Sequence, residues 1–269
     1  MPDCGLVNLG ACLPEVFFNF LFNLINAPVQ PFLQLVINLL SAQVNTSIFS
    51  SLWAIIVYML SMFYALLIVG SGLSFLISGY DSEKREQAKE WLRNIIIMIV
   101  LVQSSFFLYQ LIIDLASTMT SATLSLVSPN FFKLSINSTA GLGLSLLLIF
   151  VYIFVLIITA LVLTVRYAIV AIGIVFLPIG IFFYFIPQLK SFGSLILNIL
   201  GIAVFINFFN AILLIGFSAL VNVGAFETIQ IIILISAFLL IDILMVVLLF
   251  FAITRAVFGV YSNIKRWKE

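Results

Sequence analysis

Residues 229–254 read IQIIILISAFLLIDILMVVLLFFAIT, and the only charged side chain in this run is Asp242. A helix needs about 20 consecutive apolar residues to cross the roughly 30 Å hydrocarbon core of a bilayer. This stretch is long enough, and its single acid lies near the middle of the crossing. The stretch therefore predicts a membrane-spanning helix, and it sets the fold class expected for the rest of the chain.

The composition of the whole chain agrees with that prediction. Of its 269 residues, 64% are hydrophobic and 8% are charged, and the mean hydropathy is +1.34. Soluble domains carry about 25% charged residues, and a soluble fold of this composition would expose apolar patches far larger than monomers tolerate. We therefore expect an integral membrane protein with an all-α fold, a polytopic transmembrane helix bundle.

Charge and histidine content bear on the class of function. The net charge is +1 and histidine is absent. A soluble nucleic-acid-binding surface needs a basic stripe, and histidine is the commonest general base and the commonest metal ligand. The composition therefore predicts no enzyme active site, no metal site and no cofactor.

Five stretches meet the length requirement for a span. They are residues 49–79, 94–125, 142–165, 194–221 and 229–254. Several are longer than a straight crossing requires, so these helices must tilt or protrude. The spans make residues 49–269 a transmembrane bundle, which follows an external segment, residues 1–48.

Residues 14–44 are apolar but irregular. Amides recur every three or four residues, which places them on one face of a helix. They are Asn19, Asn23, Asn26, Gln30, Gln34 and Asn38. Pro28 and Pro31 interrupt the stretch, so we expect a pair of short amphipathic helices lying in the membrane interface. A true span with its amides facing a bundle is the alternative.

Residues 167–187 are long enough to cross a membrane, but Pro178 and Gly180 interrupt them near the middle. Non-helical backbone at membrane depth is stable only where protein or a water-filled cavity covers it. A re-entrant hairpin or a broken helix is therefore expected here.

The cations predict the sidedness of the chain. If residues 80–93 are cytoplasmic and 167–187 enter and leave on one side, ten cations lie inside and only Lys133 lies outside. The inner set is Lys84, Arg85, Lys89, Arg93, Arg166, Lys190, Arg255, Lys265, Arg266 and Lys268. Arg166 is expected at an inner helix end, where its side chain can reach water. By the positive-inside rule, we expect a multi-pass cell-membrane protein with its N-terminus outside and its C-terminus in the cytoplasm.

The external segments carry further signals. Asn45 and Asn137 begin the two Asn-x-Ser/Thr sequons, so both are possible glycosylation sites. Cys4 and Cys12 are the only cysteines, and their separation does not match a zinc site. A small disulfide on an oxidising exterior is expected, with two unpaired thiols as the alternative.

Residues 80–93, YDSEKREQAKEWLR, are the only densely charged run. They predict a cytoplasmic helix, capped by Asp81 or Ser82, that continues into the span 94–125. One interpretation is a solvated anchor. The other is a docking surface for a cytoplasmic partner, with Glu83, Lys84, Arg85, Lys89 and Arg93 as its contact residues.

Two ordered signatures resemble a known family. The first is SGYDSEKREQAKEWLRN at 78–94 followed by VQSSFFLYQLIID at 102–114. The second comprises Arg166-Tyr167, Leu177-Pro178-Ile179 and PQLKSFG at 187–193. Over about residues 50–220, the chain resembles the TrbL-type (VirB-like) polytopic inner-membrane subunits of conjugative type IV secretion systems, and is most similar to their archaeal DNA-import (CedA-like) branch. The N-terminal cysteine segment is less typical of the bacterial members.

The resemblance implies five spans with the N-terminus outside and the C-terminus inside. It also implies a channel or scaffold subunit of a conjugation-like apparatus for DNA transfer or import. Its partners would be a cytoplasmic secretion ATPase and pilin-like subunits, with DNA as the cargo. Besides the lipid bilayer, further copies of the chain are expected partners in a homo-oligomer.

Polar groups inside the spans are the candidate functional residues. Gln103, Gln110 and Asp114 share one face of the second span, and Asp242 could be partnered by Asn207 or Asn210 of the preceding span. One hypothesis makes these six residues a hydrated intramembrane path. The other makes them interhelical hydrogen bonds, each worth about 0.6 kcal/mol.

A small-molecule or ion secondary transporter, or a channel for such solutes, is the alternative function. Secondary transporters often contain paired broken helices in an inverted repeat. Here 167–187 has no convincing counterpart in the first half of the chain.

Overall fold

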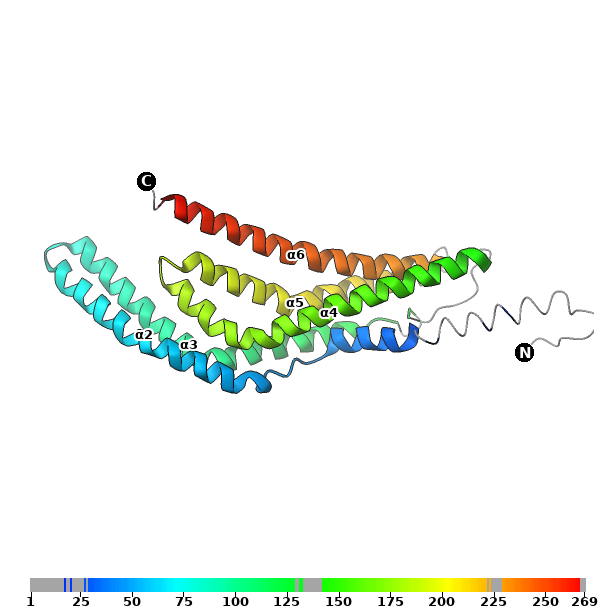
Figure 1. Cartoon of the computed structure of the whole chain (residues 1–269), viewed down its shortest axis with the longest axis horizontal. Coiled ribbons are helices and arrows are strands. Elements are labelled where there is room, and N and C mark those ends of the chain that lie inside the picture. Colours follow the sequence, from blue (N-terminus) through cyan, green and yellow to red (C-terminus); the bar gives the residue numbers. More distant parts are fainter. Residues whose placement is uncertain are drawn as a thin grey trace, which may run out of the picture. The chain divides into compact units, whose positions relative to one another are not determined.

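A computed structural model describes residues 29–128, 131–132, 142–221, 223 and 229–266, together with Phe17, Phe20 and Ala27. Every regular element in this part of the chain is helical, so the predicted all-α fold is confirmed (Figure 1). The elements are a helix Val29–Ser41, η1 (Ser47–Phe49), α2 (Ser50–Ile77), η2 (Ser78–Tyr80), α3 (Ser82–Leu124), α4 (Leu142–Phe185), α5 (Lys190–Val221) and α6 (Gln230–Arg266).

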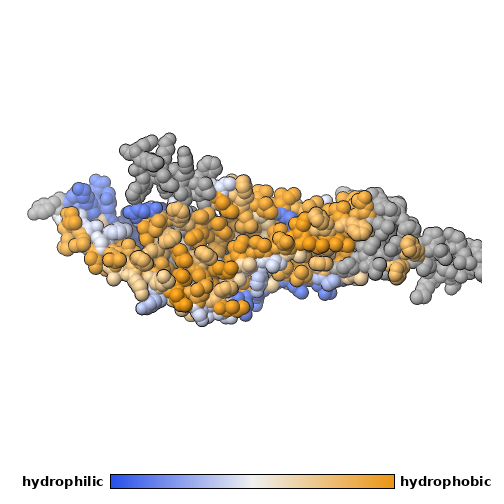
Figure 2. Space-filling model, viewed as in Figure 1, coloured by the Kyte–Doolittle hydropathy of each residue, from blue (hydrophilic) through white to orange (hydrophobic). Residues whose placement is uncertain are grey.

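Five of these helices are long and apolar enough to cross a membrane, as predicted. The spans are Ser47–Ile77, Ser82–Leu124, Leu147–Phe185, Lys190–Val221 and Gln230–Thr254. Much of the surface seen in Figure 2 is hydrophobic, as a lipid-facing surface requires. With 43 and 44 residues, α3 and α4 would each extend about 65 Å if straight, twice the thickness of the hydrocarbon core.

Residues 142–165 and 167–187 differ from the prediction. They form one continuous helix, α4, which passes through Pro178 and Gly180 and ends at Phe185. The predicted re-entrant hairpin is therefore wrong. Proline removes one backbone donor and crowds the carbonyl four residues earlier, but membrane helices tolerate it where neighbouring helices pack around it. The chain reverses instead at Ile186–Leu189, where two turn hydrogen bonds lead into α5.

The charged run and the second span also form one helix, α3. Asp81 Oδ1 accepts a hydrogen bond from the Glu83 N–H at 3.1 Å, so the predicted cap is present. Side chains from Asp81 to Gln87 are exposed. The hydrophilic residues of the α2–α3 turn gather at the left of the face shown in Figure 2.

The helix Val29–Ser41 is amphipathic, as its amides predict. Gln30, Gln34 and Asn38 are exposed, whereas the opposite face is buried in the protein, through Val29, Leu33, Val36 and Leu40. Protein therefore covers the apolar face without any need for lipid. Pro31 lies in the first turn of this helix, where a missing backbone donor costs little.

Contacts group the described residues into two compact units. Unit 1 takes its members from residues 1–42, 119–165 and 208–244, and unit 2 from 43–118, 166–207 and 245–269. The described cations all belong to unit 2: Lys84, Arg85, Lys89, Arg93, Arg166, Lys190, Arg255, Lys265 and Arg266. Lys133 and Lys268 lie outside the described residues. The sidedness of the termini stays a prediction.

Candidate functional site in the membrane-spanning helices

Arg166 is the middle residue of the span Leu147–Phe185. Its side chain is buried, with 6% of its surface exposed. Nε donates to the Ala203 carbonyl at 2.7 Å, and Nη2 donates to the Val204 carbonyl at 3.0 Å. The expectation that Arg166 reaches water from a helix end is therefore wrong. Because α4 is continuous, the residue lies at mid-helix, and α5 supplies the polar partners that water would otherwise provide.

Tyr109 joins α3 to α4 in the same unit. Its hydroxyl donates to the Val170 carbonyl at 2.7 Å, and the ring is buried. Gly173 makes this approach possible, since a Cβ there would clash with the Tyr109 hydroxyl and would lie 2.6 Å from Leu200 Cδ2. Arg166 and Tyr109 thus make three side-chain-to-backbone hydrogen bonds between helices in the core of unit 2.

Asp242 is the middle residue of the span Gln230–Thr254. Its Oδ2 lies 3.0 Å from Thr159 Oγ1 on α4, and both residues are buried. The other carboxylate oxygen, Oδ1, is buried with no hydrogen-bond partner among the described residues. Thr159 Oγ1 also lies 3.0 Å from the Val155 carbonyl. The Asp242–Thr159 pair therefore links α6 to α4 inside unit 1.

Asn207 and Asn210, the predicted partners of Asp242, do not take the place of Thr159. Asn210 is fully buried, and neither its Oδ1 nor its Nδ2 has a hydrogen-bond partner in the described part of the chain. It therefore does not form the predicted hydrogen bond to Asp242. Asn207 is also buried, but it belongs to unit 2.

The predicted stripe on α3 is present but does not line an interior. Gln103 and Asp114 are exposed on the surface of the chain. Gln110 is half-buried, and its Nε2 donates to Thr46 Oγ1 at 3.3 Å, beside the start of α2. Within a single chain, this face would meet lipid or a further protein.

The predicted docking residues are exposed at the start of α3. Glu83, Lys84, Arg85, Lys89 and Arg93 all have accessible side chains. Two pair locally, Lys84 with Asp81 and Arg93 with Glu90, each at 3.6 Å. The Arg85 guanidinium lies 5.5 Å from the centroid of the Phe75 ring. Such exposed pairs contribute little to stability, so these side chains remain accessible to a partner.

The remaining predicted sites are the two sequons and the two cysteines. Asn45 is exposed, and its Oδ1 accepts hydrogen bonds from Ser47 N and Ser47 Oγ at 3.1 and 2.6 Å. Asn137, Cys4 and Cys12 lie outside the described residues. In the described part of the chain, no group of three or more His, Cys, Asp or Glu residues could hold a metal ion.

Taken together, the helices and their intramembrane contacts define a polytopic α-helical membrane protein. No protein-family model, no curated protein and no solved structure matches the chain.

Proposed function

We propose that this chain is a channel or scaffold subunit of a conjugation-like, type IV secretion apparatus that moves DNA. One observation carries the proposal. The segments that resemble TrbL-type subunits come from two distant parts of the sequence, 78–114 and 166–193, and both belong to unit 2. The two signatures therefore fall within one packed unit.

The charged start of α3 gives this subunit a place to meet a cytoplasmic partner. The residues 81–93 contain four acids and four bases, so the surface is charged but locally balanced. Such a surface suits a partner with complementary patches of both signs. The proposed partners are a secretion ATPase and small pilin-like subunits.

The outward polar face of α3 supports a homo-oligomer. Gln103 and Asp114 would be costly against lipid, because polar side chains inside a membrane usually face protein or water. A neighbouring copy has the same orientation in the membrane and therefore offers Gln103 and Asp114 at matching depths. In this proposal the DNA path lies between copies, since Tyr109, Arg166 and the Asp242–Thr159 pair of a single chain are engaged in helix-to-helix contacts.

A secondary transporter is less well supported by the geometry. Such carriers often contain discontinuous helices. Residues 167–187 were the best candidate for one, but α4 is continuous there as far as Phe185.

Affinity purification in mild detergent, followed by mass spectrometry of the bound proteins, tests the proposal. Wild-type chain should recover a secretion ATPase and pilin-like subunits. A variant with Lys84, Arg85 and Lys89 changed to Glu should lose the ATPase while staying folded. Asp114→Asn, which lies away from this surface, should retain it. Recovery of neither partner by the wild type would overturn the proposal.

A further inference from the structure

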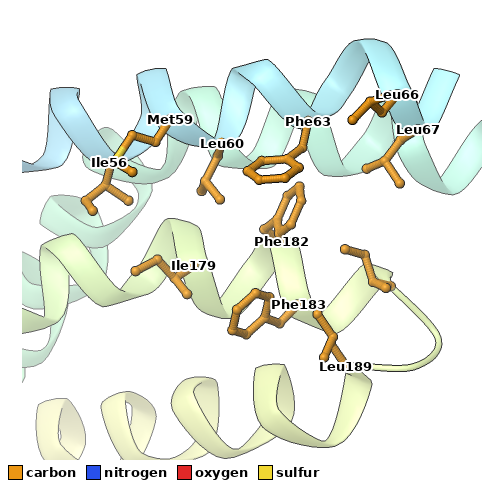
Figure 3. A pocket seen from close by; sticks show the side chains of 11 residues that line it. Ile56, Met59, Leu60, Phe63, Leu66, Leu67, Ile179, Phe182, Phe183 and Leu189 are labelled. Carbon is orange, nitrogen blue, oxygen red and sulfur yellow. The ribbon is translucent and has the colours of Figure 1, made fainter. Parts of the chain in front are cut away.

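The two units differ in the polarity of what they enclose. In unit 2, the groove between α2 and the end of α4 is lined by apolar side chains alone (Figure 3). Unit 1 buries polar atoms that have no hydrogen-bond partner among the described residues, on Tyr152, Asn210 and Asp242. Asp242 is the one with a carboxyl group, so its protonation state decides how costly its burial is.

The surroundings of Asp242 disfavour a negative charge. Asp242 is the middle residue of its span, and 7% of its surface is exposed. It has no ion-pair partner in the described part of the chain, where every cation belongs to unit 2. The only other titratable side chain described in unit 1 is Tyr152, which is also buried. A buried charge without an opposite charge is costly, above all inside a membrane.

Arg166 is the only cation of α4, the helix that carries the hydrogen-bond partner of Asp242. It lies seven residues beyond Thr159, which is about 10 Å along the helix axis. Its Nε and Nη2 atoms donate to backbone carbonyls of α5. The described contact between Asp242 and α4 is therefore made by a neutral hydroxyl.

The protons available to Thr159 can be counted. Its Oγ1 lies 3.0 Å from Asp242 Oδ2 and 3.0 Å from the Val155 carbonyl oxygen. A hydroxyl has one proton to donate, whereas a carboxylate and a carbonyl can only accept. Thr164, on the same helix, donates to the Ala160 carbonyl four residues earlier at 2.7 Å, a common arrangement for threonine in a helix. If Thr159 donates to Val155 in the same way, the proton between Thr159 and Asp242 must come from Asp242.

We propose that Asp242 is a proton-binding site inside the membrane, with a protonated Oδ2 that donates a hydrogen bond to Thr159. Each of the two contacts of Thr159 Oγ1 then has a proton of its own. Oδ1 becomes the carbonyl oxygen of a neutral acid, and leaving that oxygen without a partner costs much less than burying a carboxylate. The site lies within unit 1 and does not depend on the function proposed above.

Infrared spectroscopy of the full chain tests the proposal, because the carbonyl stretch of a protonated carboxyl group is well separated from the bands of carboxylates. The chain is measured at neutral pH in a mild detergent without ester groups, since ester carbonyls absorb in the same region. The difference spectrum between wild type and Asp242→Asn should contain one protonated-carboxyl band. Glu86→Gln, which replaces an exposed acid near the start of α3, should instead give a difference in the carboxylate bands.

Thr159 provides a second measurement, in which Asp242 itself is kept. Thr159→Val removes the hydrogen-bond acceptor, so the Asp242 band should move to higher frequency. Thr159→Ser keeps a hydroxyl and should leave the band near its wild-type position. Carboxylate bands for Asp242 in the wild type, or a protonated-carboxyl band that Thr159→Val does not move, would overturn the proposal. Recovery of the secretion partners is measured separately, so the two proposals can fail independently.

Discussion

Arg166 is a cation in the middle of an apolar helix, and its described partners are two backbone carbonyls of α5. Those carbonyls also accept the N–H groups four residues later in α5, so they keep partners when the arginine is absent. A buried charge without an opposite charge is costly. Arg166 therefore serves the docking of α4 on α5, or it has a task other than stabilising the fold.

The first prediction compares two substitutions at Arg166. Arg166→Lys keeps the charge but cannot donate in two planar directions, so it should lower the free energy of unfolding by about 1–2 kcal/mol. Arg166→Met removes the desolvation cost and leaves no orphaned acceptor, so it should be at least as stable as Arg166→Lys. Unfolding in mixed detergent micelles measures both. If Arg166→Met were clearly the less stable variant, the charge itself would be stabilising the fold.

The second prediction concerns Asp242 and Thr159. Thr159→Val removes the only described hydrogen-bond partner of the Asp242 carboxylate and should lower the free energy of unfolding by about 1–2 kcal/mol. Asp242→Asn keeps a polar partner for Thr159 and should cost less. Asp114→Asn, at an exposed position, is the control. Equal effects of Thr159→Val and Asp114→Asn would contradict a structural role for the pair.

Sequence patterns predicted the polar residues better than their partners. Asp242 was identified from its place in an apolar run, but Thr159 was missed, because the two residues are 83 positions apart. A signal was nevertheless present on α4. Tyr152, Thr159, Arg166, Gly173 and Gly180 recur every seven residues, and all are buried. The carbonyl partners of Arg166 leave no sequence signal, since every residue carries a carbonyl.

At the scale of elements, glycines set how closely α4 and α5 approach. A Cβ on Gly193 would lie 2.6 Å from Tyr184 Cα and 2.7 Å from the Gly180 carbonyl oxygen, and both of these atoms are backbone. Backbone cannot rotate away as a side chain can. The α4–α5 hairpin therefore requires a residue without a side chain at this position.

The third prediction follows from that contact. Gly193→Ala should force the hairpin apart and lower the free energy of unfolding by at least about 1–3 kcal/mol, the usual cost of overpacking. Gly201→Ala is the matched control on the same helix, because a Cβ there meets nothing within 4 Å. It should be neutral, or stabilising by up to about 1 kcal/mol through helix propensity. Thermal unfolding in detergent distinguishes the two variants.

Helix number was predictable from the sequence, but helix continuity was not. Crossing a bilayer demands long apolar runs, and hydropathy detects them directly. Whether a helix continues through Pro178 depends on which neighbours satisfy and cover the backbone there, and that is tertiary information. The surroundings of the polar stripe on α3 could not be predicted for the same reason. Periodicity places Gln103 and Asp114 on one face of the helix, but it does not indicate what that face contacts.

At the scale of the whole molecule, the number of crossings fixes which connections share a side of the membrane. With α4 as one crossing, the α2–α3 and α4–α5 connections lie on the same side, and the segment before α2 lies on the other. The cation pattern then predicts that the α2–α3 and α4–α5 connections are both cytoplasmic. Arg166 lies at mid-helix and not at an inner end, but this prediction is unchanged. The cations near both connections still favour the same, cytoplasmic side.

The fourth prediction tests that arrangement with single cysteines in a background where Cys4 and Cys12 are Ser. Lys84→Cys in α3 and Gln188→Cys in the α4–α5 turn should react with a membrane-impermeant maleimide only after the cells are permeabilised. Ser47→Cys, before α2, should react in intact cells. All three positions are exposed in the structure, so a lack of labelling reports the membrane barrier rather than burial. Labelling of Gln188→Cys but not Lys84→Cys from outside would place the two connections on opposite sides, and the five-crossing arrangement would then be wrong.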